Sequence, residues 1–214
     1  MYDALHKPLD VPVKRFVMLT TINARPRGRP RGFDPVQAVA IAQRLFHAQG
    51  YDAVSVADVT HALGINPPSF YAAFGSKAGL YARVLDRYAE TGAIPLPDLL
   101  RSDRPVADCL ASLLEEAARR YAADPVAAGC LVLEGTRCND REASEAARVF
   151  HAAAEHMILR YIAARHPDKA ERLTDFVSTT MAGLSVNARS GHGLDRLLAS
   201  ARLASLALAQ ALPA

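Results

Sequence analysis

The chain contains 214 residues, half of them hydrophobic, and carries a formal net charge of +3 at pH 7. A chain of this length and composition can bury a large core, which excludes a protein that is disordered throughout. It has no apolar run near the roughly 18–20 residues that cross a bilayer, so neither a membrane span nor a secretory signal is expected. Cys109, Cys130 and Cys138 form no CxxC pair, and this usage is typical of the reducing cytoplasm.

Positive charge is concentrated at the N-terminal end. The first 33 residues contain seven Lys or Arg and two Asp, a net charge of +5, so the remainder carries −2 of the total +3. A basic end on a nearly neutral body indicates a polyanionic partner, although a solvated tail would give the same pattern. We expect a disordered tail over residues 1–24, in which Met18 is an alternative first residue, and an extended Arg/Pro/Gly arm over residues 25–33.

Two helices with clear start signals are predicted after the arm. Asp34 is a good N-cap, Pro35 suits the first helical position, and Gly50 predicts the end of this helix. Ser55 is followed three residues later by Asp58, a spacing close to that of a capping box. The second helix is therefore expected to begin directly after Ser55.

A third, short helix is expected after a tight turn at Gly64. Asn66 is its predicted N-cap, and because Pro68 has no N–H, the Asn66 side chain should accept a hydrogen bond from the N–H of Ser69. Three short helices with a glycine between the second and third match a helix-turn-helix motif, whose third helix lies in the major groove of DNA.

The third helix is predicted to have one buried and one outward side. Phe70 and Phe74 lie four residues apart and would point into the core. The residues expected to contact DNA on the outward side are Asn66, Pro67, Pro68, Ser69, Tyr71 and Ala72. This side has no Arg, Lys, Gln or Glu, which usually read base edges. We therefore expect DNA shape and the arm, through Arg27, Arg29 and Arg31, to supply part of the specificity.

Residues 31–90 resemble the DNA-binding domain of the TetR family of bacterial regulators. The pairs Leu45-Phe46 and Gly50-Tyr51 are similar to the end of the family's first helix. The run Phe-Tyr-Ala-Ala-Phe-Gly-Ser-Lys over residues 70–77 is similar to its later signature. The resemblance implies a DNA-binding regulator of transcription and not an enzyme.

The resemblance also implies roles for particular residues. Tyr71 and Lys77 would hold DNA phosphates, and Ser55 is included among the residues expected to contact DNA. Lys77 would open a fourth helix over residues 77–90, capped by Ser76, where its charge and the helix N-terminus both favour a phosphate.

Gly92, Pro95 and Pro97 predict a boundary between a DNA-binding domain over residues 34–92 and a second domain over residues 93–214. Apolar periodicity predicts further helices over residues 105–122, 126–137, 141–165, 169–189 and 193–211. No stretch alternates as a strand does. The expected fold is all-α, with an N-terminal three-helix helix-turn-helix DNA-binding domain and a C-terminal helical ligand-binding and dimerisation domain.

The last two predicted helices are the candidates for dimerisation, as in the family. They contain a stripe with several small residues, and Gly183 and Leu184 on this stripe are expected at the contact with a second copy. A plain core face is the alternative for any one of these residues. A dimer is expected because operators read by helix-turn-helix proteins are usually two-fold symmetric.

Other functions leave few signals in the sequence. A redox- or electrophile-sensing role for Cys130 remains an alternative. An inert buried cysteine is favoured, because cysteine is among the most buried residue types. His151 and His156 are five residues apart and share no helical face, so no metal site is expected. The chain has no Gly-rich phosphate loop, nucleophile elbow or HExxH motif, so neither an enzyme nor a cofactor is predicted. A constitutive architectural DNA-binding protein would not need the long second domain.

Taken together, the sequence predicts a homodimeric, cytoplasmic repressor that binds double-stranded, palindromic operator DNA. A small-molecule effector in the second domain would shift the population toward a state whose recognition helices no longer match the operator. The fourth helix joins both domains and is the expected transmitter.

Overall fold

The computed structural model describes residues 34–212, which contain ten α-helices, one 3-10 turn and no strand. Within this part of the chain the all-α prediction is confirmed. The predicted tail and arm, with Arg27, Arg29 and Arg31, lie outside the described residues. None of the described helices is both long and apolar enough to span a bilayer.

The N-terminal helices begin and end close to where the sequence predicts. Their order is α1 (Pro35–Gln49), α2 (Val56–Leu63), α3 (Pro67–Phe74) and α4 (Lys77–Thr91). Asp34 Oδ1 accepts from the N–H of Val36, 2.9 Å away, and α1 ends at Gly50. Ser55 and Asp58 form the complete capping box at the start of α2. Each of these starts depends on a side chain and a backbone group within three residues, which is why they can be predicted locally.

The remaining helices cover most of the rest of the chain. They are α5 (Leu96–Leu99), α6 (Val106–Tyr121), α7 (Leu131–Gly135), α8 (Arg141–Ala163), the 3-10 turn η1 (Pro167–Lys169), α9 (Ala170–Arg189) and α10 (Leu194–Ala211). The short helix α5 was not predicted, because Pro95 and Pro97 indicated only a break. Pro97 occupies the first turn of α5, where no backbone N–H is needed.

The helix predicted over residues 126–137 is wrong except for the five residues of α7. The chain before α7 is a loop that includes Gly129, which is buried and has φ +79°. A Cβ at Gly129 would lie 2.9 Å from both the carbonyl oxygen and Oγ of Ser185. The loop is therefore set by close packing on α9, a contact between distant residues that periodicity does not reveal.

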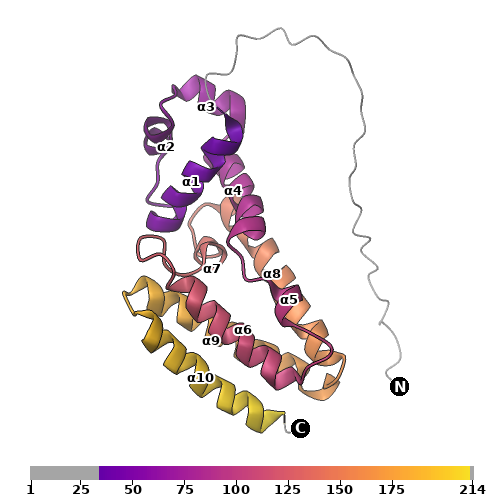
Figure 1. Cartoon of the computed structure of the whole chain (residues 1–214). Coiled ribbons are helices and arrows are strands. Elements are labelled where there is room, and N and C mark those ends of the chain that lie inside the picture. The colour runs from indigo at the N-terminus through magenta and orange to yellow at the C-terminus, as the bar shows by residue number, and fades with distance from the viewer. Residues whose placement is uncertain (1–33, 213–214) are drawn as a thin grey trace, which may run out of the picture. The chain divides into compact units, whose positions relative to one another are not determined.

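Two hydrophobic clusters fill the described part of the chain. One lies mainly among α6, α8, α9 and α10, and α6, α9 and α10 run side by side in Figure 1. The other lies among α1 to α4 and also contains Leu131 of α7 and Ala143 and Ala147 of α8. The core beneath the helix-turn-helix is thus completed by residues that come more than 50 positions later in the chain.

Hydrogen bonds also join the loop between α1 and α2 to the start of α8. The Tyr51 hydroxyl donates to Asp140 Oδ2 at 2.9 Å, and the Asn139 N–H donates to Asp52 Oδ2 at 3.0 Å. Asp140 also caps α8, because its Oδ1 accepts from the N–H of Ala143. The start of α8 is therefore fastened directly to the loop between α1 and α2.

Candidate DNA-binding surface and ligand pocket

Helix α3 has the buried and exposed sides that the sequence predicts. Phe70 and Phe74 are buried, and their ring centroids lie 5.5 Å apart. The predicted DNA-contacting residues of this segment are exposed, except for half-buried Ser69; they are Asn66, Pro67, Pro68, Tyr71 and Ala72. Tyr71 is 52% exposed, although its ring also packs edge-on against Phe70. Its hydroxyl is therefore carried on an anchored ring.

The turn before α3 is held by local hydrogen bonds. Gly64 adopts the left-handed conformation, with φ +63°, and Asn66 Oδ1 accepts from the N–H of Ser69 at 3.0 Å, as predicted. Two of the first residues of α3 are prolines that have no N–H to satisfy. The N-terminus of α3 is thus fixed before any partner is bound.

Ser55 and Lys77 both have structural partners. The Ser55 hydroxyl donates to Asp58 Oδ2 at 2.6 Å, and these bonds lower the pKa of Asp58. Lys77 Nζ donates to the carbonyl oxygens of Tyr51 and Val54, at 3.1 and 3.0 Å, and lies 3.9 Å from the centroid of the Tyr51 ring. These contacts fix the α1–α2 loop on α4.

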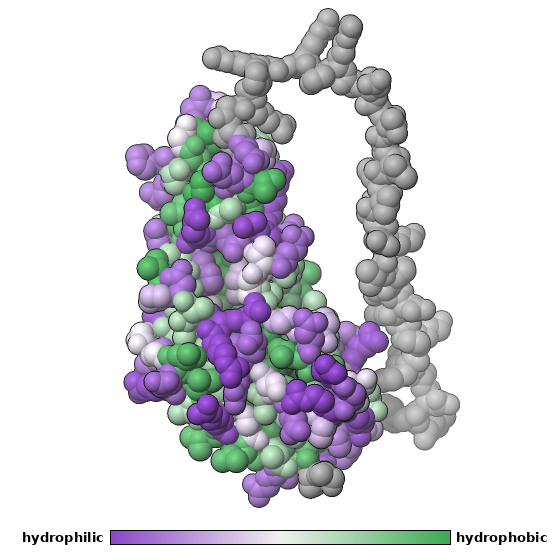
Figure 2. Space-filling model, in the orientation of Figure 1, coloured by the Kyte–Doolittle hydropathy of each residue, from purple (hydrophilic) through white to green (hydrophobic). Residues whose placement is uncertain are grey.

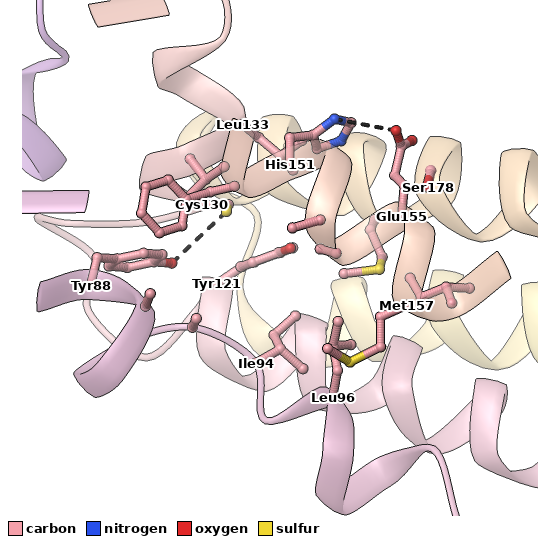
Figure 3. Close-up of a pocket in the computed structure, with 18 of the residues that line it drawn as sticks. Tyr88, Ile94, Leu96, Tyr121, Cys130, Leu133, His151, Glu155, Met157 and Ser178 are labelled. Atoms are coloured by element: carbon pink, nitrogen blue, oxygen red, sulfur yellow. Dashed lines mark hydrogen bonds and ion pairs between the residues drawn. The ribbon is translucent and has the colours of Figure 1, made fainter. Parts of the chain in front are cut away.

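A pocket with a volume of about 250 Å³ lies among α4, α5, α6, α7, α8 and α9 (Figure 3). Its walls are mostly aliphatic, aromatic or thioether side chains, including Ile94, Leu96, Phe150, Met157 and Met181. Among the described residues that line it, none is Lys or Arg. A site of this shape and composition suits a small organic molecule.

One end of the pocket carries a cluster of polar groups, which we call the phenol–thiol cluster (Tyr88, Tyr121 and Cys130). The Tyr88 hydroxyl donates to Cys130 Sγ at 3.9 Å, and the Tyr121 hydroxyl lies near enough to this thiol to influence its pKa. Burial raises the pKa of all three groups. They are therefore neutral at pH 7, and Cys130 is held as a thiol, whereas the thiolate is the reactive form. This argues against the sensing alternative for Cys130.

The other polar groups of the pocket lie away from this cluster. His151 Nδ1 is 3.5 Å from Glu155 Oε2, on the far side of the pocket from Tyr88 in Figure 3. The described residues contain no group of three His, Cys, Asp or Glu that could hold a metal ion. Tyr88 and Tyr121 could not be predicted as neighbours from the sequence, because they lie 33 positions apart on different helices and share no motif.

The C-terminal end of α1 is linked to the pocket by what we call the Arg189 junction (Arg189, His47, Gly129 and Glu134). Arg189 Nη1 donates to the His47 carbonyl at 3.0 Å, and Arg189 Nε lies 3.4 Å from Glu134 Oε2. His47 Nε2 donates to the Gly129 carbonyl at 3.2 Å. Burial lowers the pKa of His47, so its ring is neutral at pH 7. The ring also packs edge-on against pocket residue Tyr88.

The outer faces of α9 and α10 carry apolar side chains. Leu203 and Leu206 of α10 are 69% and 68% exposed, and Phe176 and Gly183 of α9 are also exposed. Figure 2 shows hydrophobic side chains gathered on the surface where α10 lies. The prediction that Leu184 belongs to this face is wrong, because Leu184 is only 2% exposed and packs in the core with α6 and α10.

The arrangement of α1 to α3, with a capped third helix that exposes one side, defines a helix-turn-helix DNA-binding protein. A family model described as bacterial regulatory proteins of the tetR family matches residues 38–84. The HTH-type transcriptional repressor BdcR of Escherichia coli is 55% identical over 191 residues, covering 89% of this chain and 97% of that repressor. The chain therefore belongs to the TetR family of bacterial transcriptional regulators.

Further comparisons agree with this assignment. The HTH-type transcriptional repressor ComR of Escherichia coli is 30% identical over 184 residues, covering 80% of this chain and 87% of ComR. A solved structure of a cysteine mutant of the TetR family regulator CifR, complexed with a 26-base-pair double-strand operator DNA, is 34% identical. The match covers 84% of this chain and 99% of that one, with a TM-score of 0.71. These relatives are regulators of transcription and not enzymes.

Proposed function

We propose that this protein is a ligand-responsive repressor that binds operator DNA as a homodimer in the cytoplasm. The observation that carries the proposal is the presence of both an exposed α3 surface and an apolar pocket that is lined in part by α4, the helix that follows α3. A protein that only bound DNA would not need the pocket. The names of BdcR and ComR as repressors support repression over activation.

The proposed DNA interface is the exposed side of α3 together with neighbouring groups. Residues 34–92 are the proposed DNA-binding domain, and residues 93–214 the proposed ligand-binding and dimerisation domain. Tyr71 and Lys77 would hold phosphates, which position the protein without reading sequence. Asn66, Pro67, Pro68, Ser69 and Ala72 would face base edges. The Ser55 hydroxyl already donates to Asp58. Ser55 would therefore contact the DNA backbone only through its exposed position.

The basic arm before α1 is proposed as a second DNA-binding segment. Arginine favours narrow A·T-rich minor grooves because their potential is more negative. With few base-reading side chains on α3, Arg27, Arg29 and Arg31 would add both affinity and a preference for flanking A·T pairs. Removal of the arm would reduce the slope of log K against log salt by about 0.9 for every phosphate that the arm neutralises.

The proposed dimer interface is the exposed face of α9 and α10. Phe176, Thr179 and Gly183 follow one another at spacings of three and four residues, as do Ala199, Leu203 and Leu206 on α10, so each set lies along one side of its helix. Exposed apolar stripes of this kind typically mark an interaction surface. Two copies related by two-fold symmetry would cover both stripes and present two α3 helices to a palindromic operator.

The proposed response to a ligand runs from the pocket to the DNA-binding end. Tyr88 belongs to α4 and contacts His47 at the end of α1, and Cys130 is adjacent to Gly129 in the Arg189 junction. A ligand that moves Tyr88 or Cys130 would change the packing of α1 and α4. Such a ligand needs only to bind one arrangement better than the other to shift the population.

Selection of bound sequences from a random DNA library with the full-length protein tests the proposal. We expect enrichment of one sequence with two half-sites related by two-fold symmetry. The Ala72→Glu variant, which places a carboxylate on the exposed side of α3, should lose the enrichment while retaining its helical content. Absence of an enriched sequence with the wild type, or equal enrichment with Ala72→Glu, would contradict the proposed interface.

A further inference from the structure

We infer that the pocket takes a neutral, largely apolar molecule with one hydrogen-bond-accepting oxygen, of the ketone type, held between Tyr88 and Tyr121. The inference deepens the proposed function, because it names the chemical class of the effector. Three features support it: the size of the pocket, the absence of Lys and Arg among its described lining residues, and the donor groups of the phenol–thiol cluster.

The volume of the pocket sets the size of the molecule. An apolar cavity of about 150 Å³ in another protein stays dry and holds benzene. The present pocket, at about 250 Å³, has room for a benzene ring with a short alkyl chain. Met157 and Met181 form part of its wall, and their flexible thioether side chains can adjust to the shape of the occupant.

The charged groups of the pocket disfavour ionic ligands. With no Lys or Arg among the described lining residues, a carboxylate or phosphate would find only His151 as a potential cation, and His151 already lies beside Glu155. A protonated amine would find only Glu155, which already lies beside His151. A buried charge is costly unless it is paired, so a neutral molecule is favoured over either ion.

The phenol–thiol cluster supplies donors that lack a strong acceptor. The Tyr88 hydroxyl donates over 3.9 Å to Cys130 Sγ, and a thiol sulfur is a weak acceptor. In Figure 3 the Tyr121 hydroxyl points into the pocket. Because an oxygen accepts hydrogen bonds better than a thiol sulfur does, a ligand oxygen would take over at least one phenol donor. This cluster therefore selects for an acceptor on one end of an otherwise apolar molecule.

Four probes that share one skeleton separate these features: 1-phenyl-1-butanone, butylbenzene, 1-phenylbutylamine and 2-phenylpentanoate. Calorimetric titration of the full-length protein should show the ketone binding about three- to tenfold more tightly than butylbenzene, which is the effect of one net hydrogen bond. The amine and the carboxylate should bind more weakly than butylbenzene, because they bring an unpaired charge into the pocket.

Tyrosine variants test where the oxygen is held. Tyr88→Phe and Tyr121→Phe should each reduce the affinity for the ketone toward that for butylbenzene, with the butylbenzene affinity unchanged. Tyr161→Phe is the matched control, because its hydroxyl bonds to the Arg101 carbonyl and does not line this pocket. Circular dichroism should show the same helical content in all three variants.

Each other outcome overturns a stated part of the inference. Equal affinities for ketone and butylbenzene would overturn the oxygen site, and tight binding of the amine or carboxylate would overturn the preference for neutral molecules. Binding of none of the four probes at millimolar concentration would overturn the ligand class. A parallel titration with operator DNA separates this inference from the proposed function. A ketone that binds without releasing DNA would contradict the ligand response and leave the ligand class standing.

Discussion

The residues proposed to contact DNA at α3 lie within seven consecutive positions, from Asn66 to Ala72, whereas the pocket gathers residues from Tyr88 to Met181 on six helices. The first region depends on caps and a turn whose partners lie within a few residues. The second exists only when distant helices are packed together. The proposed DNA-binding surface is thus built from local chemistry, and the proposed ligand site from long-range packing. Substitutions in the two regions should therefore differ in what they damage.

The largest expected effect compares two leucines near the C-terminal end. Leu184→Asp should lower the free energy of unfolding by about 4 kcal/mol or more, because it buries an unpaired carboxylate in the core shared by α6, α9 and α10. Leu203→Asp changes an exposed residue on α10 and should leave the fold intact but dissociate the dimer. Urea denaturation and sedimentation would measure the two effects. A Leu184→Asp variant as stable as the wild type, or a dimeric Leu203→Asp variant, would break the distinction between core and interface.

A second loss, of about 3 kcal/mol in the free energy of unfolding, is expected at the Arg189 junction. Gly129→Ala adds a Cβ that lies 2.9 Å from Ser185 and Arg189 atoms, at a positive φ. Gly191→Ala is the control, since its φ is +87° but no atom lies within 4 Å of the added Cβ. Gly191→Ala should lower the free energy of unfolding by only about 1 kcal/mol, which is the cost of the left-handed backbone conformation alone. If urea denaturation gave the same loss of unfolding free energy in both variants, close packing at Gly129 would not contribute to stability.

The smallest expected changes in stability should distinguish Lys77 from Tyr71. Lys77→Ala should weaken operator binding and also lower the free energy of unfolding by about 1–2 kcal/mol, because it removes two hydrogen bonds to carbonyl groups. Tyr71→Phe removes an exposed hydroxyl and should weaken only operator binding. Binding titrations at matched salt and thermal melts would measure both. Wild-type affinity in Tyr71→Phe would refute its phosphate role, and unchanged stability in Lys77→Ala would refute the loop contact.

The same contrast explains which parts could be predicted from the sequence. Asp34, Ser55 and Asn66 each cap a helix through a partner two or three positions away, so their helices could be located from residue types and spacing. The buried and exposed sides of α3 also follow from periodicity. The location of the basic arm relative to DNA stays a prediction.

The misses arose where a residue's partner lies far along the chain. The loop at Gly129 packs on α9, which a helical apolar pattern over residues 126–137 does not reveal. Gly183 and Leu184 are neighbours in sequence, and only the packing of α9 shows that one is exposed and the other buried. The carbonyl partners of Lys77 lie 23 and 26 positions away, so its second role had no sequence signal.

The contribution of α7 and α8 to the core beneath the helix-turn-helix bears on the construction of hybrid regulators. A graft that joined the first 92 residues to the ligand domain of another family member would separate Tyr51 from Asp140, and α1–α4 from Leu131, Ala143 and Ala147. The recipient would have to supply side chains of matching size and a hydrogen-bond acceptor at those places. A working exchange of operator specificity in this protein therefore requires that α7 and the first turns of α8 be transplanted together with the DNA-reading helices.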